Sequence, residues 1–308
     1  MPTLTREVPV ERDAPVPTWF GVGGRADRLA RPRTLAGLRA CLAMDPDLLI
    51  LGDGANLLVA DEGVDRLVVS LGEPAFNRAR FDASSGRVLA HAGANLPKVI
   101  LESVRLGLSG LEGLGGIPAT IGGATVMNAG GKFGEISGVV TRVHALRRGD
   151  SAGVEVSREK IGFGYRASGL GDLIVYAVEM QLTPDDPARV RDRLKDVMAY
   201  KKESQPLKER SAGCAFRNPT LEGSIDGVGE AGSRVSAGLL IDRAGCKGLR
   251  QGGARVSDHH ANFLVAERGS SAAEVERLMR EVERRVFDAF GVRLVREIVV
   301  WSRRGNVA

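Results

Sequence analysis

Two glycine-rich segments contain the residues of this sequence that are best suited to holding a dinucleotide. One is LGDGANLLV at 51–59, and the other is GLEGLGGIPATIGGATVMNAGG at 110–131. Backbone N–H groups in such segments can surround a pyrophosphate, because the missing side chains let the anion approach. Neither segment has Rossmann G-x-G-x-x-G spacing or the Gly-Lys-Ser/Thr of a Walker loop. Tight turns in a crowded sheet explain any single glycine well, but they explain the whole longer segment less well.

Cysteines and histidines are the other residues that could carry chemistry. Cys41, Cys214 and Cys246 are odd in number and widely spaced, which argues against a disulfide scaffold or a zinc cluster. Cys41 lies in an apolar helical pattern, and we interpret it, like Cys246, as a small buried hydrophobic residue. The neighbours His259 and His260 point in opposite directions if their segment is extended. The sequence therefore predicts no metal site.

The elements that position these segments follow from the spacing of apolar residues. This spacing predicts helices at 34–44, 96–106, 187–202, 236–244 and 270–290. It predicts strands at 47–51, 67–71, 87–92, 139–147, 173–182, 261–266 and 292–301. The charged helix at 187–202 is expected to connect two units. Because helices and strands mix without a regular βαβ rhythm, the pattern favours the α+β class over a doubly wound sheet.

Composition limits the class of protein and its partners. The 308 residues include 43% hydrophobic and 26% charged ones, which is typical of a soluble globular protein with room for two domains. A net charge of +5 suits an anionic ligand such as a nucleotide. Few aromatic residues and no dense basic block make nucleic acid a weaker candidate. The polar N-terminal segment and the lack of a long apolar run predict a cytoplasmic protein without a membrane anchor.

Several motifs, in a fixed order, resemble one enzyme family. They are WFGVGG at 19–24, LGDGANLLV at 51–59, GLGGIPATIGGATVMNAGG at 113–131, FGYRAS at 163–168, SAGCAFRNP at 211–219 and VREIVVW at 295–301. Together they resemble UDP-N-acetylmuramate dehydrogenase, also called UDP-N-acetylenolpyruvoylglucosamine reductase (the MurB family). The order holds from about Thr18 to Trp301. The short stretch between Arg166 and Cys214 resembles the branch that lacks an extra tyrosine-bearing loop.

The resemblance implies a fold, a cofactor and partners. It implies an FAD-binding domain of the PCMH type, shared with vanillyl-alcohol-oxidase-like flavoenzymes, at 1–202, in two lobes of about 1–75 and 76–202. A smaller substrate-binding domain would occupy 203–308. FAD would be held noncovalently, NADPH would be the co-substrate, a UDP-sugar the substrate, and the protein a monomer. The residues implied to contact FAD are Gly52, Asp53, Gly54, Ala55, Asn56, Leu57, Gly116, Ile117, Pro118, Ala119, Thr120, Gly122, Gly123, Ala124, Asn128 and Gly130.

The resemblance also implies a reaction and its catalytic residues. NADPH would reduce FAD, and the flavin would pass a hydride to the enolpyruvyl group, with a proton following at the carbon that bears the ether oxygen. Arg166 would bind the carboxylate with two parallel donors. Cys214 would supply the proton, since a thiol with a pKa of about 8.5 is a better acid than a hydroxyl. Glu297 would lie near the substrate carboxylate. The implied substrate-binding residues are Tyr165, Arg166, Arg217 and Asn218.

Some positions depart from the family pattern. Asp53 and Ala55 stand where the family often has Gly or Glu and then Ser, so backbone donors would make more of the phosphate contact. Ala119 replaces a common glycine. Cys214 replaces a common serine, and Arg217 replaces a lysine while keeping its charge. Lys201, Lys202 and Lys208 are further, weaker candidates for the substrate diphosphate.

Two other functions stay open from sequence alone. A different flavin enzyme on the same fold, such as an alcohol or sugar oxidase, would share the glycine segments but would not require Arg166, Cys214 and Glu297 together. A flavin-binding or nucleotide-sugar-binding regulator without turnover would be compatible with Asp53 and Ala55. The chemically competent residues at all three catalytic positions favour the reductase.

Overall fold

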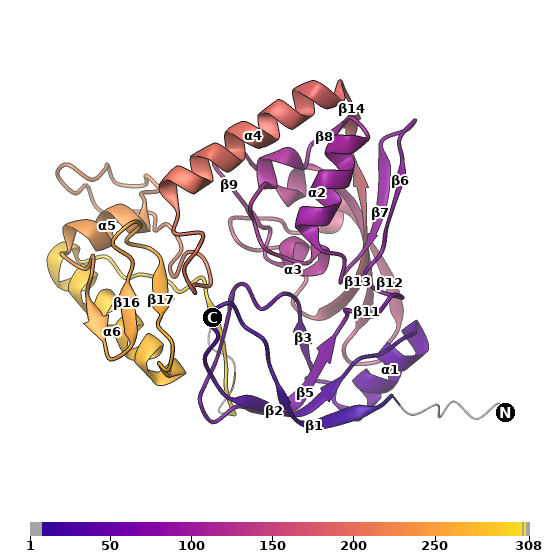
Figure 1. The fold of residues 1–308 in the computed structure, drawn as a ribbon, viewed down its shortest axis with the longest axis horizontal. Coiled ribbons are helices and arrows are strands. Elements are labelled where there is room, and N and C mark those ends of the chain that lie inside the picture. Colours follow the sequence, from indigo (N-terminus) through magenta and orange to yellow (C-terminus); the bar gives the residue numbers. More distant parts are fainter. Residues whose placement is uncertain (1–7, 304, 306–308) are drawn as a thin grey trace. The chain divides into compact units, whose positions relative to one another are not determined.

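The computed structural model describes residues 8–303 and 305, which form two compact units (Figure 1). The first unit contains Ala26–Asp53 and Arg66–Lys201, together with the described residues up to Ala14. The second contains Pro15–Arg25, Gly54–Asp65 and the described residues from Lys202 onward. Residues 1–7 of the polar N-terminal segment lie outside the described residues. An FAD-binding domain at 1–202 and a substrate domain at 203–308 stay a prediction, because compactness does not show what each unit binds.

Two sheets form the frame of the first unit. The smaller has the order β1-β2-β5-β3, and β3 runs parallel to β5. Its strands are Val10–Pro15 (β1), Arg25–Ala30 (β2), Leu49–Leu51 (β3) and Val64–Ser70 (β5). The larger is antiparallel, with the order β12-β11-β13-β7-β6. Its strands are Ala79–Asp82 (β6), Arg87–His91 (β7), Val140–Arg147 (β11), Gly153–Ser157 (β12) and Leu173–Gln181 (β13).

Four helices belong mainly to the first unit. They are Leu35–Met44 (α1), Leu96–Arg105 (α2), Ile121–Val126 (α3) and Pro187–Ser204 (α4). Polar side chains cap the first three, because each accepts a hydrogen bond from an otherwise unpaired N–H of the first turn. The capping residues are Thr34, Asn95 and Thr120. Short strands connect these elements at Leu108–Ser109 (β8), Gly130–Gly131 (β9), Gly134–Glu135 (β10) and Thr183–Pro184 (β14).

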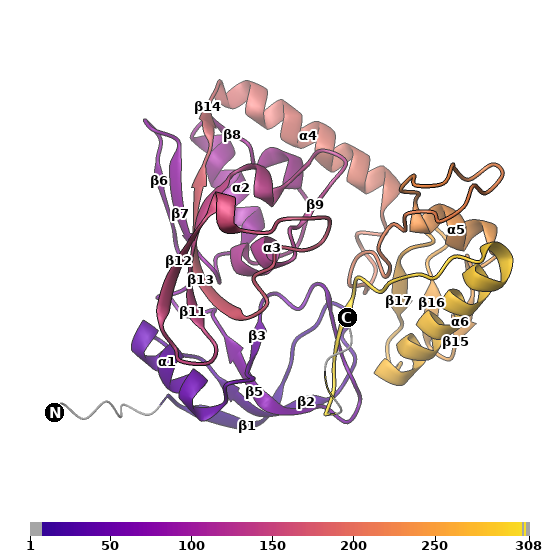
Figure 2. The same cartoon turned by 180° about the vertical axis from the view of Figure 1, so that it is seen from behind.

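The second unit has its own core and its own small sheets. Strands Arg250–Gln251 (β15), Ala254–Val256 (β16) and Leu264–Ala266 (β17) pair antiparallel, and Leu57–Val59 (β4) pairs in parallel with Val299–Trp301 (β18). Helices Ala237–Arg243 (α5) and Ala272–Phe290 (α6) complete the unit (Figure 2). Helix α6 starts at a capping box of Ser271 and Glu274 and ends at Gly291. Its apolar stripe is buried in the core of the unit.

The mixed α+β class predicted from the sequence is confirmed, and all five predicted helices are present with ends within two residues of the prediction. The predicted strand at 292–301 is wrong over most of its length. Only Val299–Trp301 is a strand, paired with the three residues of β4, whereas Arg296 forms an isolated β-bridge with Phe216 and no continuous ladder. The predicted strand at 261–266 is likewise shortened to β17, because residues 260–263 form a turn closed by a bond from the Phe263 N–H to the His260 carbonyl. Within the described residues, no helix has the length and apolar character needed to cross a membrane.

Candidate functional site

In the first unit, some of the residues expected to hold FAD, Gly52, Asp53 and Thr120, lie where β3 ends and α3 begins. Gly52 faces Thr120, and a Cβ at Gly52 would lie 2.9 Å from the Thr120 hydroxyl. Asn95 donates a hydrogen bond of 3.2 Å to the Asp53 carboxylate. Burial raises the pKa of Asp53, while the hydrogen bond from Asn95 opposes that change. Both glycine-rich segments therefore contribute to one small region of this unit.

The short helix α3 was missed in the sequence, where its glycines suggested only a loop. Its first N–H groups are already used: Ile121 donates to Ala94, Gly122 to Ala92, and Gly123 to the Thr120 hydroxyl. Just before it, no backbone acceptor is present for the N–H groups of Gly116, Ala119 and Thr120 within the described residues. These three N–H groups are able to bind an anion, and the small side chains around them leave room for it.

Helix α4 packs against the same segment. A Cβ at Gly115 would meet the Leu194 side chain at 2.5 Å, and one at Gly116 would meet Lys201 and Met198 at 3.0 and 3.2 Å. Gly116 also has a φ of +75°, which other residues rarely adopt. The backbone conformation therefore favours glycine at 116, and packing against α4 leaves little room for a side chain at 115 or 116.

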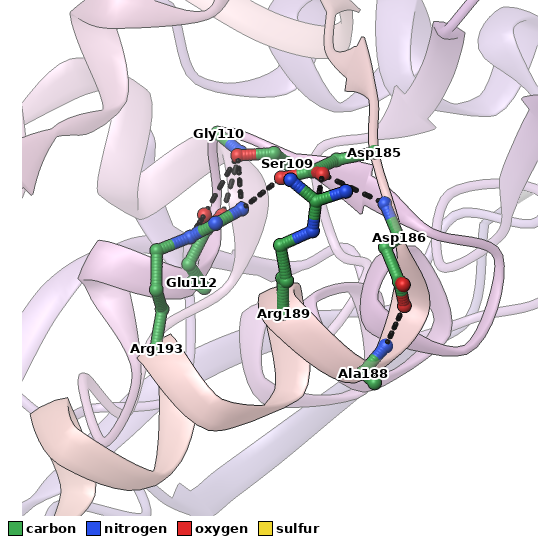
Figure 3. Close-up of polar contacts among 8 residues, drawn as sticks. All are labelled: Ser109, Gly110, Glu112, Asp185, Asp186, Ala188, Arg189 and Arg193. Atoms are coloured by element: carbon green, nitrogen blue, oxygen red, sulfur yellow. Dashed lines mark hydrogen bonds and ion pairs between the residues drawn. The ribbon is translucent and has the colours of Figure 1, made fainter.

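An ion-pair cluster anchors α4 to the start of the glycine segment (Figure 3). Glu112 is buried and accepts hydrogen bonds from the Ser109 hydroxyl at 2.7 Å, the Gly110 N–H at 2.6 Å and Arg193 of α4 at 2.8 Å. Arg193 also donates to Asp185 at 2.7 Å. Burial alone would raise the pKa of Glu112, but these donors outweigh it and hold the pKa below its ordinary value.

Arg166 lies at the other end of the glycine segment. Its Nη2 donates a hydrogen bond of 2.8 Å to the Gly130 carbonyl, and its guanidinium lies over the Tyr165 ring at 5.2 Å. Its φ of 54° is strained for a residue with a side chain. The β-bridge between Gly164 and Ala167 closes the turn that enforces this conformation. Asn128 supports the turn by donating to the Gly164 carbonyl at 2.9 Å.

The second unit contains the rest of the first glycine segment, because the boundary between the units falls after Asp53. Gly54 has a φ of +64°, and a Cβ there would collide with the Pro17 carbonyl oxygen. Asn56 donates a hydrogen bond of 2.9 Å from its side-chain amide to the Glu297 carbonyl. The Asn56 carbonyl accepts from the Val299 N–H at 3.1 Å. Ala55 and Leu57 flank Asn56, and Leu57 begins β4.

Cys214 and Glu297 lie on neighbouring backbone segments of the second unit. The Glu297 N–H donates to the Ala215 carbonyl at 2.8 Å, and Phe216 forms a β-bridge with Arg296. On its other side, the Cys214 segment forms a β-bridge with Phe263. The structure thus places two of the three predicted catalytic residues on paired backbone segments, and a shared site for their side chains stays a prediction. Arg166 belongs to the other unit, so its convergence with them stays a prediction.

Asn262 was not identified as a functional candidate from the sequence. It is 2% exposed, and its side chain accepts from the Phe216 N–H at 2.9 Å and donates to the Phe216 carbonyl at 2.8 Å. It lies in the segment HHANF at 259–263, in which only the two histidines were considered from the sequence. In that segment the His259 ring bonds the Glu203 carbonyl, and His260 accepts from the Asn262 N–H at 3.1 Å. Burial lowers the pKa of His260.

The two expected substrate-binding residues after Cys214 differ in their surroundings. The Nε of Arg217 is buried and has no hydrogen-bond partner among the described residues, and the same holds for the hydroxyl of Ser211. Such groups are costly unless a ligand or water bonds them. The Asn218 side chain instead accepts from the Ala237 N–H at 3.0 Å, at the start of α5. Asn218 therefore also supports the fold of this unit.

The three cysteines, all described, form no disulfide and differ in exposure. Cys41 and Cys246 are buried, and burial raises the pKa of both, to about 11 for Cys41. Cys214 is half-buried. Their interpretation as small core residues therefore fits Cys41 and Cys246, while Cys214 is the most exposed of the three.

Comparisons with known proteins cover nearly the whole chain. Residues 29–151 match the profile described as FAD binding domain, and residues 205–301 match that of UDP-N-acetylenolpyruvoylglucosamine reductase, C-terminal domain. The UDP-N-acetylenolpyruvoylglucosamine reductase of Paramagnetospirillum magneticum is 39% identical over 292 residues, covering 93% of this chain and 90% of the relative. That of Moorella thermoacetica is 37% identical over 290 residues, covering 92% and 90%. The crystal structure of the Thermus caldophilus enzyme matches with a TM-score of 0.80 at 39% identity, covering 96% of this chain and 100% of that one.

Proposed function

The chain belongs to the UDP-N-acetylenolpyruvoylglucosamine reductase family and is an FAD-dependent oxidoreductase, and we propose that it reduces the enolpyruvyl ether of UDP-N-acetylglucosamine to UDP-N-acetylmuramate with electrons from NADPH. The product is a precursor of peptidoglycan. The observation that carries the proposal is the pairing of the Cys214 and Glu297 segments in a chain that matches its relatives over nearly its full length.

Bound FAD supplies the hydride chemistry of the reaction, and the glycine segments fit its pyrophosphate. In the first unit, the N–H groups of Gly116, Ala119 and Thr120 would bind the phosphate oxygens. Gly52 keeps the space in front of Thr120 open, since its Cβ would approach the Thr120 hydroxyl. The neighbouring small residues of the first unit that are predicted to contact FAD, from Ile117 to Ala124, would line this cradle through backbone and small side chains.

Arg166 would bind the carboxylate of the enolpyruvyl group. A guanidinium offers parallel donors to a planar carboxylate and stabilises the negative charge that grows there during reduction. The contacts of Arg166 support this role. Its side chain is held in one place by the strained turn, by the hydrogen bond to Gly130 and by the Tyr165 ring. A charge fixed before the reaction needs no reorganisation during it.

Cys214 would donate the proton that completes the reduction, and Glu297 would act beside the substrate carboxylate. Both residues sit on backbone that is hydrogen-bonded on two sides, so their side chains project from rigid segments. Arg217 would pair with an anionic group of the substrate, which would supply a partner for its buried Nε. Tyr165 and Asn218 would complete the substrate site.

The proposal is tested by separating the two half-reactions of purified protein under anaerobic conditions. We expect flavin absorbance, bleaching on addition of NADPH, and recovery only when the enolpyruvyl substrate is added. Cys214→Ala should bleach normally but form product at least 100-fold more slowly, whereas Cys214→Ser should retain most of the rate, because a hydroxyl can also donate a proton. Normal product formation by Cys214→Ala would contradict the assignment. Oxygen consumption with a hydroxylated substrate would instead indicate an oxidase.

A further inference from the structure

Asn262 lies at the point where the backbone around Cys214 loses a regular strand partner. Residues 260–263 turn, as the bond from the Phe263 N–H to the His260 carbonyl shows at 2.9 Å. A turning chain cannot present successive N–H and C=O groups to its neighbour as an extended strand does. The β-bridge between Cys214 and Phe263 is accordingly isolated.

The side chain of Asn262 replaces the missing partner. Its amide pairs with both the N–H and the C=O of Phe216, at 2.9 and 2.8 Å, and its own carbonyl accepts from the Ala215 N–H at 2.8 Å. A carboxamide is the side chain that can accept from and donate to one residue at the same time, as a peptide group would. Three hydrogen bonds from one residue therefore fix the two residues that follow Cys214.

The opposite edge of this segment is fixed by the closing strand region. Glu297 donates its N–H to the Ala215 carbonyl at 2.8 Å, and the Arg217 N–H donates to the Val295 carbonyl at 2.8 Å. The segment carrying Cys214 is therefore held between Asn262 on one side and residues 295–297 on the other. Loss of either side would let the peptide groups at 215 and 216 rotate, and the thiol would move with them.

We infer that Asn262 is a positioning residue that sets the place of the Cys214 thiol relative to Glu297, an inference that rests on the role proposed for Cys214. Asn262 is nearly fully buried and bonds backbone groups, so it acts through the Cys214 segment. It therefore serves proton delivery to the substrate and leaves reduction of the flavin by NADPH unaffected.

The test compares Asn262→Ala with Ser257→Ala, a matched control in the same part of the chain. Ser257 is fully buried, and its hydroxyl accepts from the His259 N–H at 3.2 Å, so its loss also removes one buried interaction. The first measurement is the rate at which iodoacetamide labels Cys214 in the holoenzyme, followed by mass spectrometry. Because Cys41 and Cys246 are buried, they serve as internal references for thiols that the native fold protects from labelling. The second measurement is each half-reaction by anaerobic stopped flow.

For Asn262→Ala we expect at least a fivefold change in the labelling rate of Cys214 and at least a tenfold slower reoxidation of flavin by the enolpyruvyl substrate. Flavin reduction by NADPH should stay within twofold of the unmodified rate. Ser257→Ala should keep all three rates within twofold. If Asn262→Ala yields no folded holoenzyme, Asn262→Asp, which keeps the acceptor for the Phe216 N–H but loses the donor to its carbonyl, should change the labelling rate and slow reoxidation by at least twofold more than Ser257→Ala does.

The inference is overturned if the Asn262 variant matches Ser257→Ala in every rate, or if both half-reactions fall equally. Cys214→Ala, measured alongside, distinguishes failure of the inference about Asn262 from failure of the proposed function. Normal turnover by Cys214→Ala would remove the catalytic role of the thiol, yet the labelling rate would still report whether Asn262 positions it. Loss of turnover in Cys214→Ala with an unchanged Asn262 variant would refute the positioning role alone.

Discussion

The side-chain amide of Asn56 donates a 2.9 Å hydrogen bond to the backbone carbonyl of Glu297, which lies 241 positions further along the chain. A residue of the first glycine segment therefore fixes the strand region that carries a proposed catalytic carboxyl group. The parallel pairing of β4 with β18 begins directly beyond this bond. The same short segment thus serves the fold of the second unit as well as the proposed cofactor contact.

Asn56→Ala should destabilise the protein by about 1 kcal/mol, because the Glu297 carbonyl loses a partly buried donor. Reoxidation of flavin by substrate should slow more than its reduction by NADPH. Urea unfolding and the two half-reactions measure these effects. Asn77→Ala is the control, since Asn77 also donates to a carbonyl, that of Gly72, but at an exposed position. Equal behaviour of the two variants would show that the Asn56 bond contributes nothing specific.

Arg166 allows stability and activity to be separated at one residue. Its φ of 54° costs a residue with a Cβ about 1 kcal/mol or more but costs glycine nothing. Arg166→Gly should therefore be about 1 kcal/mol more stable than Arg166→Ala, although both lose the bond to Gly130. Both should reduce the substrate at least 100-fold more slowly while accepting electrons from NADPH normally. Substrate reduction by Arg166→Gly at the unmodified rate would exclude the proposed carboxylate contact.

The sequence predicted the long amphipathic helices best, because their apolar period and caps are local features. Helix α6 is an example, with Ser271 at its start and Gly291 at its end. The same reasoning failed for α3, where Gly122 and Gly123 disfavour a helix that packing against β13 and β7 nevertheless supports. The order of the strands was beyond local reasoning, because parallel pairs such as β4 with β18 join distant residues.

In the candidate site, too, some residues could be identified from local sequence motifs, whereas others depend on contacts between distant residues. Cys214 and Glu297 were identified through motifs, and their pairing agrees with a shared site. Asn262 was overlooked because its function depends on a turn that is visible only in the fold. The sequence also could not predict that Asn56 has two roles, a proposed cofactor contact and a structural one. Nothing in a glycine-rich loop indicates that its side chain bonds the Glu297 carbonyl.

Glu112 should contribute more to stability than the exposed carboxylates of α4, the helix to which it is paired. Replacing Glu112 with Gln removes the charge that accepts from Arg193, Ser109 and Gly110, and should cost about 1–3 kcal/mol at neutral pH. Asp192→Asn, in an exposed pair with Lys195 on α4, should cost less than about 0.5 kcal/mol. Urea unfolding of both variants measures the difference. A similar cost for both would mean that solvent screens the Glu112 cluster.

The contribution of Glu112 should also depend on pH. Because its pKa is lower in the folded than in the unfolded protein, the carboxylate stabilises the fold fully above its ordinary pKa of 4.5. This stabilisation is lost as the pH falls through the lowered folded value. The difference in free energy of unfolding between the unmodified protein and Glu112→Gln should therefore be constant from pH 7 to 6 and shrink below about pH 4.5. A difference that stays constant on acidification would contradict the lowered pKa.

Asp53 should weaken FAD binding by the proposed cradle. Burial raises its pKa, so the ionised carboxylate is disfavoured in the folded protein, and a bound pyrophosphate would disfavour it further. Asp53→Asn keeps an oxygen that accepts from Asn95 and should lower the Kd for FAD about fivefold, equivalent to about 1 kcal/mol.

Asp47→Asn is the matched control, because Asp47 is exposed and lies before the other end of β3, so it changes the net charge equally without facing the cradle. Fluorescence titration of apoprotein with FAD measures both. For the unmodified protein, FAD affinity should also rise as the pH falls toward the raised pKa of Asp53, because protonation of the carboxylate removes the repulsion, whereas Asp53→Asn should show a flatter profile. An equal gain in affinity from Asp47→Asn would assign the effect to net charge, and a pH profile unchanged by Asp53→Asn would place the carboxylate away from the phosphates.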